Sequence, residues 1–241
     1  MRVPVPCRLA GGGGRWNKGG MNAFAVSCAA PFLVAEFATP QAMVSWSLTR
    51  PGFVEARKVA WLHVRDDDLP LGVDPVELLE TRMAVAGHAD AVHLMTSRDV
   101  ARHHLAAACF DGVTSTCLAT AGLGNAARVG APPLPAKPVG TINLLAHVDR
   151  PLSQGALLEA LSIAAEARTA AVIDAGWKVG GQVATGTGTD CIVVAAPAGE
   201  PGEAFAGLHT AVGAAIGRAV HDAISQACAT WIGERQREAA R

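Results

Sequence analysis

The sequence has little charge and no long hydrophobic run. Charged residues make up 17% of the 241 residues, and the formal net charge is −1. No Lys/Arg cluster is long enough to indicate binding to nucleic acid or to an anionic membrane surface. No apolar run reaches the roughly 18 residues that a membrane-spanning helix needs. We therefore expect neither a nucleic acid nor a membrane as partner.

Motifs for metal binding, redox chemistry and common hydrolases are also missing. No two of the six cysteines have CxxC spacing, so the sequence indicates neither a zinc site nor a redox pair. His88, His93, His103 and His104 do not match HExxH, and no GxSxG segment occurs. The acidic run at residues 66–68 could bind a hard cation, but a solvated loop is the commoner role. We expect no protein metal site, and cysteines that act as small buried hydrophobic residues in a reducing cytosol.

The first 20 residues have no pattern that could pack. They include four consecutive glycines, Gly11 to Gly14, and predict a flexible leader. The uncharged stretch at residues 23–35 is interrupted by Pro31 and continues into an apparent strand, so we predict no secretion signal and a cytoplasmic protein. We hypothesise that Met21 is the natural start. The predicted division is a leader over 1–20 and one domain over 21–241.

Half of the residues are hydrophobic, and a chain of this length buries roughly 70% of its unfolded surface. Two strands, 32–37 and 42–48, are predicted to form a hairpin around Thr39-Pro40-Gln41. Further strands are predicted at 58–64, 91–96, 113–121, 141–148 and after residue 190, and helices at 74–87, 97–109, 153–176 and 208–231. Residues 122–130 read as a loop and 131–138 as a connector. This order predicts an α+β fold, a single mixed-sheet layered domain with long helices packed on the sheet.

The most distinctive stretch is QVATGTGTDCIVVAA, residues 182–196. Its glycines permit a close approach of the backbone to another group, and its threonines and Asp190 supply polar groups at the same place. If the stretch is extended, the threonines share one face and Asp190 points to the other. Two interpretations stay open on this stretch alone: a cradle for a ligand, or a Gly/Thr turn before a core strand that Asp190 caps.

Four segments in order resemble the adenosylcobinamide amidohydrolase family of cobamide salvage. They are GLGNAARVG at 122–130, GTIN at 140–143 with the helix motif EARTAAVIDAG at 166–176, ATGTGTD at 184–190, and GLHTAVG at 207–213. VSWSLTRPGF and KVAWLHV, nearer the start, resemble the proteobacterial branch. Two departures stand out: Pro51-Gly52 lies where members carry Gly-Gly, and Arg168 replaces a lysine.

The resemblance implies hydrolysis of the amide that joins the aminopropanol arm to the corrin ring, giving adenosylcobyric acid. Cobalt would arrive with the corrinoid substrate, so no cofactor is expected, and homo-oligomer formation stays open. The residues carried over are Asn125, Arg128, Thr141, Asn143, Thr185, Gly186 and Gly188 for binding, and Thr187, Thr189, Asp190 and His209 for catalysis.

Amide hydrolysis needs an activated nucleophile, an oxyanion site and a proton for the leaving amine. Asp190 or His209 is a candidate general base with the other orienting it, and Thr187 or Thr189 is a candidate nucleophile. We expect Asp190→Ala to abolish turnover with little change in stability. Two other classes stay open: a non-catalytic corrinoid- or nucleotide-binding protein, and a Thr-nucleophile amidase or acyltransferase acting on another amide.

Overall fold

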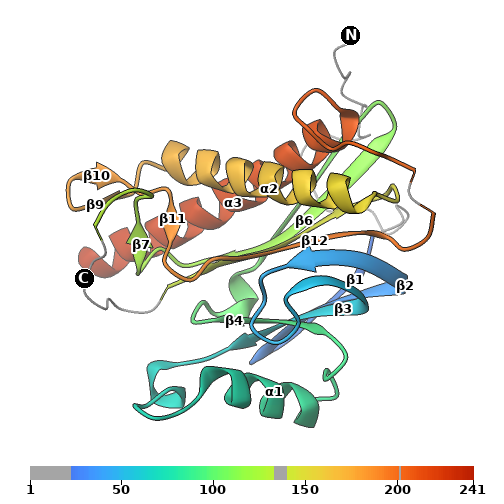
Figure 1. The fold of residues 1–241 in the computed structure, drawn as a ribbon. Helices are drawn as coiled ribbons and strands as arrows, with labels where there is room; N and C mark the ends of the chain where they lie inside the picture. Colours follow the sequence, from blue (N-terminus) through green and yellow to red (C-terminus); the bar gives the residue numbers. More distant parts are fainter. Residues whose placement is uncertain (1–22, 133–139, 201) are drawn as a thin grey trace.

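The computed structural model describes residues 23–132, 140–200 and 202–241, and Figure 1 shows their arrangement in layers. An eight-stranded sheet has the order β4-β3-β2-β12-β8-β6-β5, with β1 paired to β2. The β3–β4 and β12–β8 pairs are parallel and the others are antiparallel. The strands are β1 (Ala25–Ala29), β2 (Phe32–Ser45), β3 (Gly52–His63), β4 (Val92–Thr96), β5 (His104–Phe110), β6 (Val113–Ala121), β8 (Ile142–Val148) and β12 (Cys191–Pro197).

Three helices cover the sheet from two sides (Figure 1). They are α1 (Pro75–Val85), α2 (Gln154–Asp174) and α3 (Ala211–Ala239). The long helices α2 and α3 pack on the half of the sheet formed by β5, β6, β8 and β12, whereas α1 packs on the half that contains β3 and β4. The mixed sheet with long helices packed on it confirms the α+β prediction.

A separate core lies between the two halves of the sheet. Successive residues of β8 point to different cores. Leu144 belongs to the cluster under α2 and α3, whereas Leu145 packs with Leu33 and Trp61 from the other half of the sheet. Because helices cover one face of β8 and the second half of the sheet covers the other, this strand is buried along its whole length. Its sequence is therefore a continuous run of mostly apolar residues.

The predicted hairpin around Pro40 is wrong. Residues 32–45 form one strand, β2, and its hairpin partner is β3. The register shifts within β2: the five steps from Glu36 to Gln41 face only two steps on β3, from Lys58 to Ala56. Pro40 lies in this bulge, where its missing N–H breaks no ladder bond.

Two other expectations fail. The segment predicted to be helical at 97–109 contains a short 3-10 turn, Val100–Arg102, followed by strand β5. Its alanines occur in both helices and strands, and tertiary pairing with β6 decides between them. The last helix begins after Thr210, whose side chain accepts a bond from the Gly213 N–H, so Leu208 precedes the helix and is exposed.

The remaining predicted elements are confirmed. Asp74 caps α1 through the Val76 N–H at 2.8 Å, and Ser153 caps α2 through the Ala156 N–H at 3.1 Å. Gly176, with φ of +68°, ends α2 as expected. The strands predicted at 91–96, 113–121 and 141–148 correspond to β4, β6 and β8. The leader, the Met21 hypothesis and most of the connector fall outside the described residues.

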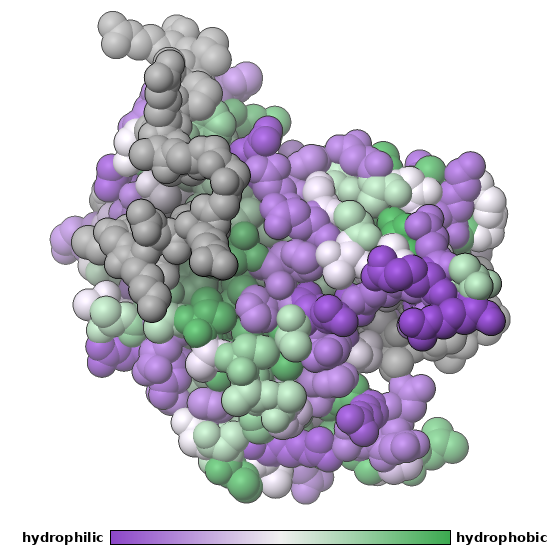
Figure 2. Space-filling model, turned by 180° about the vertical axis from the view of Figure 1, so that it is seen from behind, coloured by the Kyte–Doolittle hydropathy of each residue, from purple (hydrophilic) through white to green (hydrophobic). Residues whose placement is uncertain are grey.

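Figure 2 shows the far face of the molecule, where hydrophilic side chains cover much of the visible surface with smaller hydrophobic areas among them. Exposed large hydrophobic residues are spread over several parts of the chain, among them Val85 at the end of α1 and Leu71, Val129 and Phe205 in loops. Over the described ranges, no helix has both the length and the apolar character needed to cross a membrane.

Candidate functional site

A pocket of about 650 Å³ lies between the two halves of the sheet. One wall consists of the starts of β8 and β12 with the loop before each, and the other is the segment from His93 to Ser97, which contains most of β4. Trp46 and Leu48, just after β2, form an apolar rim that is 44% and 52% exposed. The volume is in the range of small-molecule sites, and the lining combines apolar side chains with a few polar groups.

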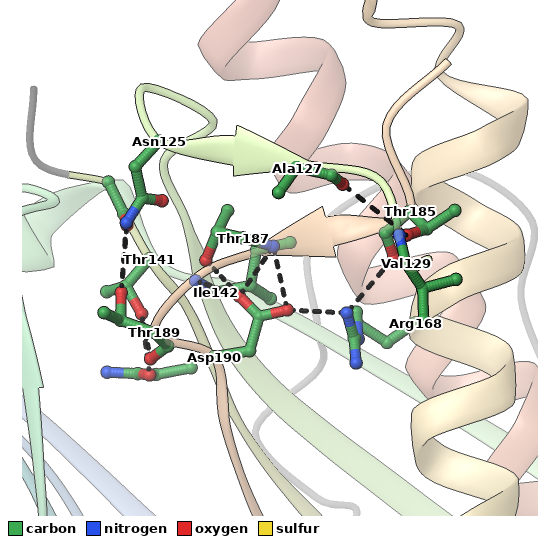
Figure 3. Close-up of polar contacts among 12 residues, drawn as sticks. Asn125, Ala127, Val129, Thr141, Ile142, Arg168, Thr185, Thr187, Thr189 and Asp190 are labelled. Atoms are coloured by element: carbon green, nitrogen blue, oxygen red, sulfur yellow. Dashed lines mark hydrogen bonds and ion pairs between the residues drawn. The ribbon is translucent and has the colours of Figure 1, made fainter. Parts of the chain in front are cut away.

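Asp190, which lines the pocket, is the centre of a dense polar network (Figure 3). Its carboxylate accepts bonds from the N–H of Ile142 at 3.1 Å and from both the N–H and the hydroxyl of Thr187. Arg168, on α2, contributes an ion pair at 2.6 Å. The Asp190 side chain is 7% exposed and that of Arg168 is 15% exposed. Asp190 therefore holds the loop, β8 and α2 together.

These contacts leave Asp190 poorly suited to act as a general base. Burial raises the pKa of its carboxyl, and Arg168, Thr187 and Ile142 act against that shift. Both oxygens already accept bonds from protein groups. Removing one partner of a buried ion pair costs about 3–5 kcal/mol. The expectation that Asp190→Ala leaves stability nearly unchanged therefore does not fit this geometry.

Gly186 is a glycine because Arg168 passes over it. A Cβ at Gly186 would overlap the Arg168 guanidinium and would lie 2.7 Å from Asp190 Oδ2. Gly186 and Thr187 form β11, which pairs with β7 (Ala126–Ala127). The close approach that the glycine-rich pattern predicts is thus made to the protein's own arginine at this position.

Two other predicted binding residues face the same side, away from the pocket lining. The Thr185 hydroxyl accepts from the Val129 N–H at 2.8 Å, and its C=O accepts from Arg168 at 3.2 Å. Arg128 donates to the C=O of Val183, in the short strand β10 (Gln182–Val183), at 2.9 Å. Thr185 and Arg128 therefore connect the segment at 122–130 with the glycine-rich stretch at 182–190.

The pocket side of the network contains the remaining motif residues (Figure 3). Thr141 donates to the C=O of Thr189 at 2.7 Å, and Asn143 donates to the C=O of Met95 at 2.7 Å. Asn125 and Thr189 lie across from each other, with Nδ2 and Oγ1 3.4 Å apart, and Oδ1 of Asn125 is buried with no partner among the described residues. These four residues and Gly188 line the pocket.

His209 is not among the residues that line the pocket. The segment before it is anchored by the Ala206 N–H, which donates to Glu159 at 2.7 Å. Glu159 precedes Arg168 by nine residues on α2, which corresponds to roughly 13 Å along a helix. The predicted pair of Asp190 and His209 is therefore not formed.

The pocket also contains groups that the sequence did not single out as functional. His93 lines the wall, with Nδ1 3.0 Å from the Thr49 hydroxyl and Nε2 2.8 Å from the C=O of His88. The carbonyl fixes the proton on Nε2, so Nδ1 accepts from Thr49. Burial lowers the pKa of His93. Trp46 donates to the C=O of Asp190 at 2.7 Å. No local spacing links these residues to the motif loops, because β2 and β4 meet the loops only through the folded sheet.

Comparisons with solved structures give distant matches. A protein of Pyrococcus horikoshii matches with a TM-score of 0.45 and 11% identity, covering 93% of this chain and 82% of its own. A Burkholderia beta-aminopeptidase matches with a TM-score of 0.42 and 16% identity, covering 81% and 78%. We draw no functional conclusion from these two matches.

Sequence comparisons are more specific. The family model described as adenosylcobinamide amidohydrolase matches residues 18–236. A protein of Halobacterium salinarum named adenosylcobinamide amidohydrolase is 35% identical over 202 residues, covering 79% of this chain and 82% of its own. These matches confirm the resemblance seen in the four motifs, and the chain belongs to the adenosylcobinamide amidohydrolase family.

Proposed function

We propose that this protein hydrolyses the amide between the aminopropanol arm and the corrin ring of adenosylcobinamide. The products are adenosylcobyric acid and the free amino alcohol, and the acid re-enters cobamide synthesis. Family membership supports this activity, because the family and the haloarchaeal relative carry its name. We place the activity in the cytoplasm and treat the cobalt as part of the substrate.

One observation carries the proposal: residues from separate family motifs meet at a single pocket. Asn125, Thr141, Asn143, Gly188 and Thr189 all line it, although up to 64 residues separate them in the sequence. The exposed apolar rim gives a flat, weakly charged corrinoid a surface to cover, and the polar wall gives its amides groups to bind.

The roles follow from the geometry. The Asn125 side chain and the Thr189 hydroxyl would hold the reacting amide, since both residues line the pocket. The attacking group would be water: it would give a proton to the Thr49 hydroxyl as Thr49 gives its own to His93 Nδ1, and the proton would return by the same route to the leaving amine. Asp190 lines the pocket, but its carboxylate oxygens accept bonds from Ile142, Thr187 and Arg168, so its main role would be to position the loop.

A single incubation tests the proposal. Purified protein is mixed with adenosylcobinamide, with and without chelator, and the products are identified by mass spectrometry. We expect adenosylcobyric acid and the released amino alcohol in equal amounts. Tight binding without product would instead support a corrinoid-binding protein, and an acyl adduct on a threonine with no response to cobinamide would support another amidase.

A further inference from the structure

Strand β4 is the end strand of the sheet and leaves one side of its backbone open. It pairs only with β3 in the described sheet. The Val64 N–H donates to the C=O of Thr96 at 2.8 Å, so the backbone groups of Thr96 point toward β3. Since successive residues of a strand point their N–H and C=O to alternate sides, those of Leu94 also point to β3, whereas those of His93 and Met95 point to the open side.

The open side of β4 faces the pocket. All five residues from His93 to Ser97 belong to the pocket lining. One carboxamide already binds there, because Asn143 Nδ2 donates to the C=O of Met95 at 2.7 Å. Within the described ranges, no group bonds the N–H of Met95 or the N–H and C=O of His93. Such groups in a binding pocket are costly unless water or a ligand satisfies them.

We infer that the open edge of β4, meaning the backbone groups of His93 and Met95, binds the peripheral carboxamides of the substrate. The inference rests on the proposed function, which supplies a ligand fringed with carboxamides. A carboxamide has a carbonyl to accept from the Met95 N–H and an amino group to donate to the His93 C=O. It thus takes the place that a neighbouring strand would have, as in recognition by strand addition.

The first test removes one backbone donor. Met95→Pro deletes the N–H at a position where an edge strand tolerates proline, and Met95→Leu is the matched control that keeps it. The probe is adenosylcobyric acid, which retains peripheral carboxamides and lacks the cleavable arm. We expect Met95→Leu to bind within twofold of the wild type by equilibrium dialysis, and Met95→Pro to bind about tenfold more weakly.

The second test needs no variant, so it still tests binding of carboxamides to the edge of β4 if Met95→Pro fails to fold. The same corrinoid with its peripheral carboxamides converted to methyl esters keeps the carbonyl acceptors but has no N–H donors for His93. We expect the wild-type protein to bind it at least about tenfold more weakly than the amide form. Equal binding of ester and amide, or of folded Met95→Pro and Met95→Leu, would overturn the inference. Wild-type protein that binds neither corrinoid contradicts the proposed function itself.

Discussion

At the scale of single residues, the four motifs contain two kinds of polar group. Thr185 and Thr187 lie outside the pocket lining and bond only to protein groups, whereas Asn125, Asn143, Thr189 and Asp190 line the pocket. The sequence identified both kinds without separating them, because alternation along a strand predicts opposite faces but not which face meets solvent. The partner of Asp190 is Arg168, so the replacement of lysine noted in the helix motif concerns the ion pair.

The two histidines provide a matched pair of variants. We expect His93→Gln to lower kcat by at least about 10²-fold, because it removes the imidazole that we propose as the proton acceptor at the pocket wall. His209→Gln should leave kcat within twofold, since His209 is exposed and lies away from the pocket. Adenosylcobinamide turnover measured for both variants, with Tm as a check on folding, tests this. Full activity in His93→Gln would remove His93 from the chemistry.

The pH profile adds a second readout for His93. Burial lowers the pKa of this imidazole, so it stays neutral and able to accept a proton below the ordinary histidine range. The kcat of the wild type should therefore persist as the pH falls through 6.5 and decline only at lower pH.

At the scale of elements, most of the helices and strands were predictable because their ends carry standard signals. Asp74-Pro75 and Ser153 mark helix starts, and Gly176 marks a helix end. The failures share one cause. The bulge at Pro40 and strand β5 both depend on partners far along the chain, which local patterns do not contain.

The glycine-rich loop has two glycines with different reasons to lack a side chain. A Cβ at Gly186 would overlap Arg168, whereas a Cβ at Gly188 would meet only Asn125 Nδ2, at an ordinary 3.8 Å. We expect Gly186→Ala to destabilise the protein by about 3 kcal/mol or more, because the buried ion pair with Asp190 must separate.

Gly188→Ala is the control, with an expected change in stability below about 1 kcal/mol. Its methyl group projects near Asn125 in the pocket, so its effect should be on KM. Urea unfolding and steady-state kinetics of both variants distinguish the two roles. Similar stability losses at the two positions would contradict the assignment of Gly186 to the arginine contact.

At the scale of the whole molecule, the pocket exists because the two halves of the sheet face each other. Each half supplies one wall, so the sequence could indicate the motif loops of one wall but not the opposing wall from β4. His147 lies in the core between the halves, against Phe24 and Phe37, and contacts Gln41 Oε1 through Nε2 at 3.2 Å.

We expect acid to lower the free energy of unfolding through His147. Burial lowers the pKa of His147 from 6.5 to about 4, so the unfolded chain takes up a proton over a range where the native protein does not. Stability therefore falls as the pH drops from 6.5 to 4, by about 3 kcal/mol for this residue.

His147→Gln should abolish that part of the pH dependence. The measurement is the free energy of unfolding in urea at several pH values between 7 and 4, compared between the variant and the wild type. His93 and His104 also have lowered pKa values and act in the same direction, so the difference between the two proteins isolates His147. Parallel curves would show that His147 is not the group responsible.

The bulge in β2 has a consequence for how this family can vary in length. Trp46 and Leu48, which form the rim of the pocket, lie just after the end of β2, beyond the bulge. Removing one residue between Glu36 and Gln41 would turn every later side chain of β2 to the opposite face. The rim would then point into the core, and core residues such as Met43 would point outward. The length of a segment outside the pocket lining thus decides which side chains form the rim of the pocket.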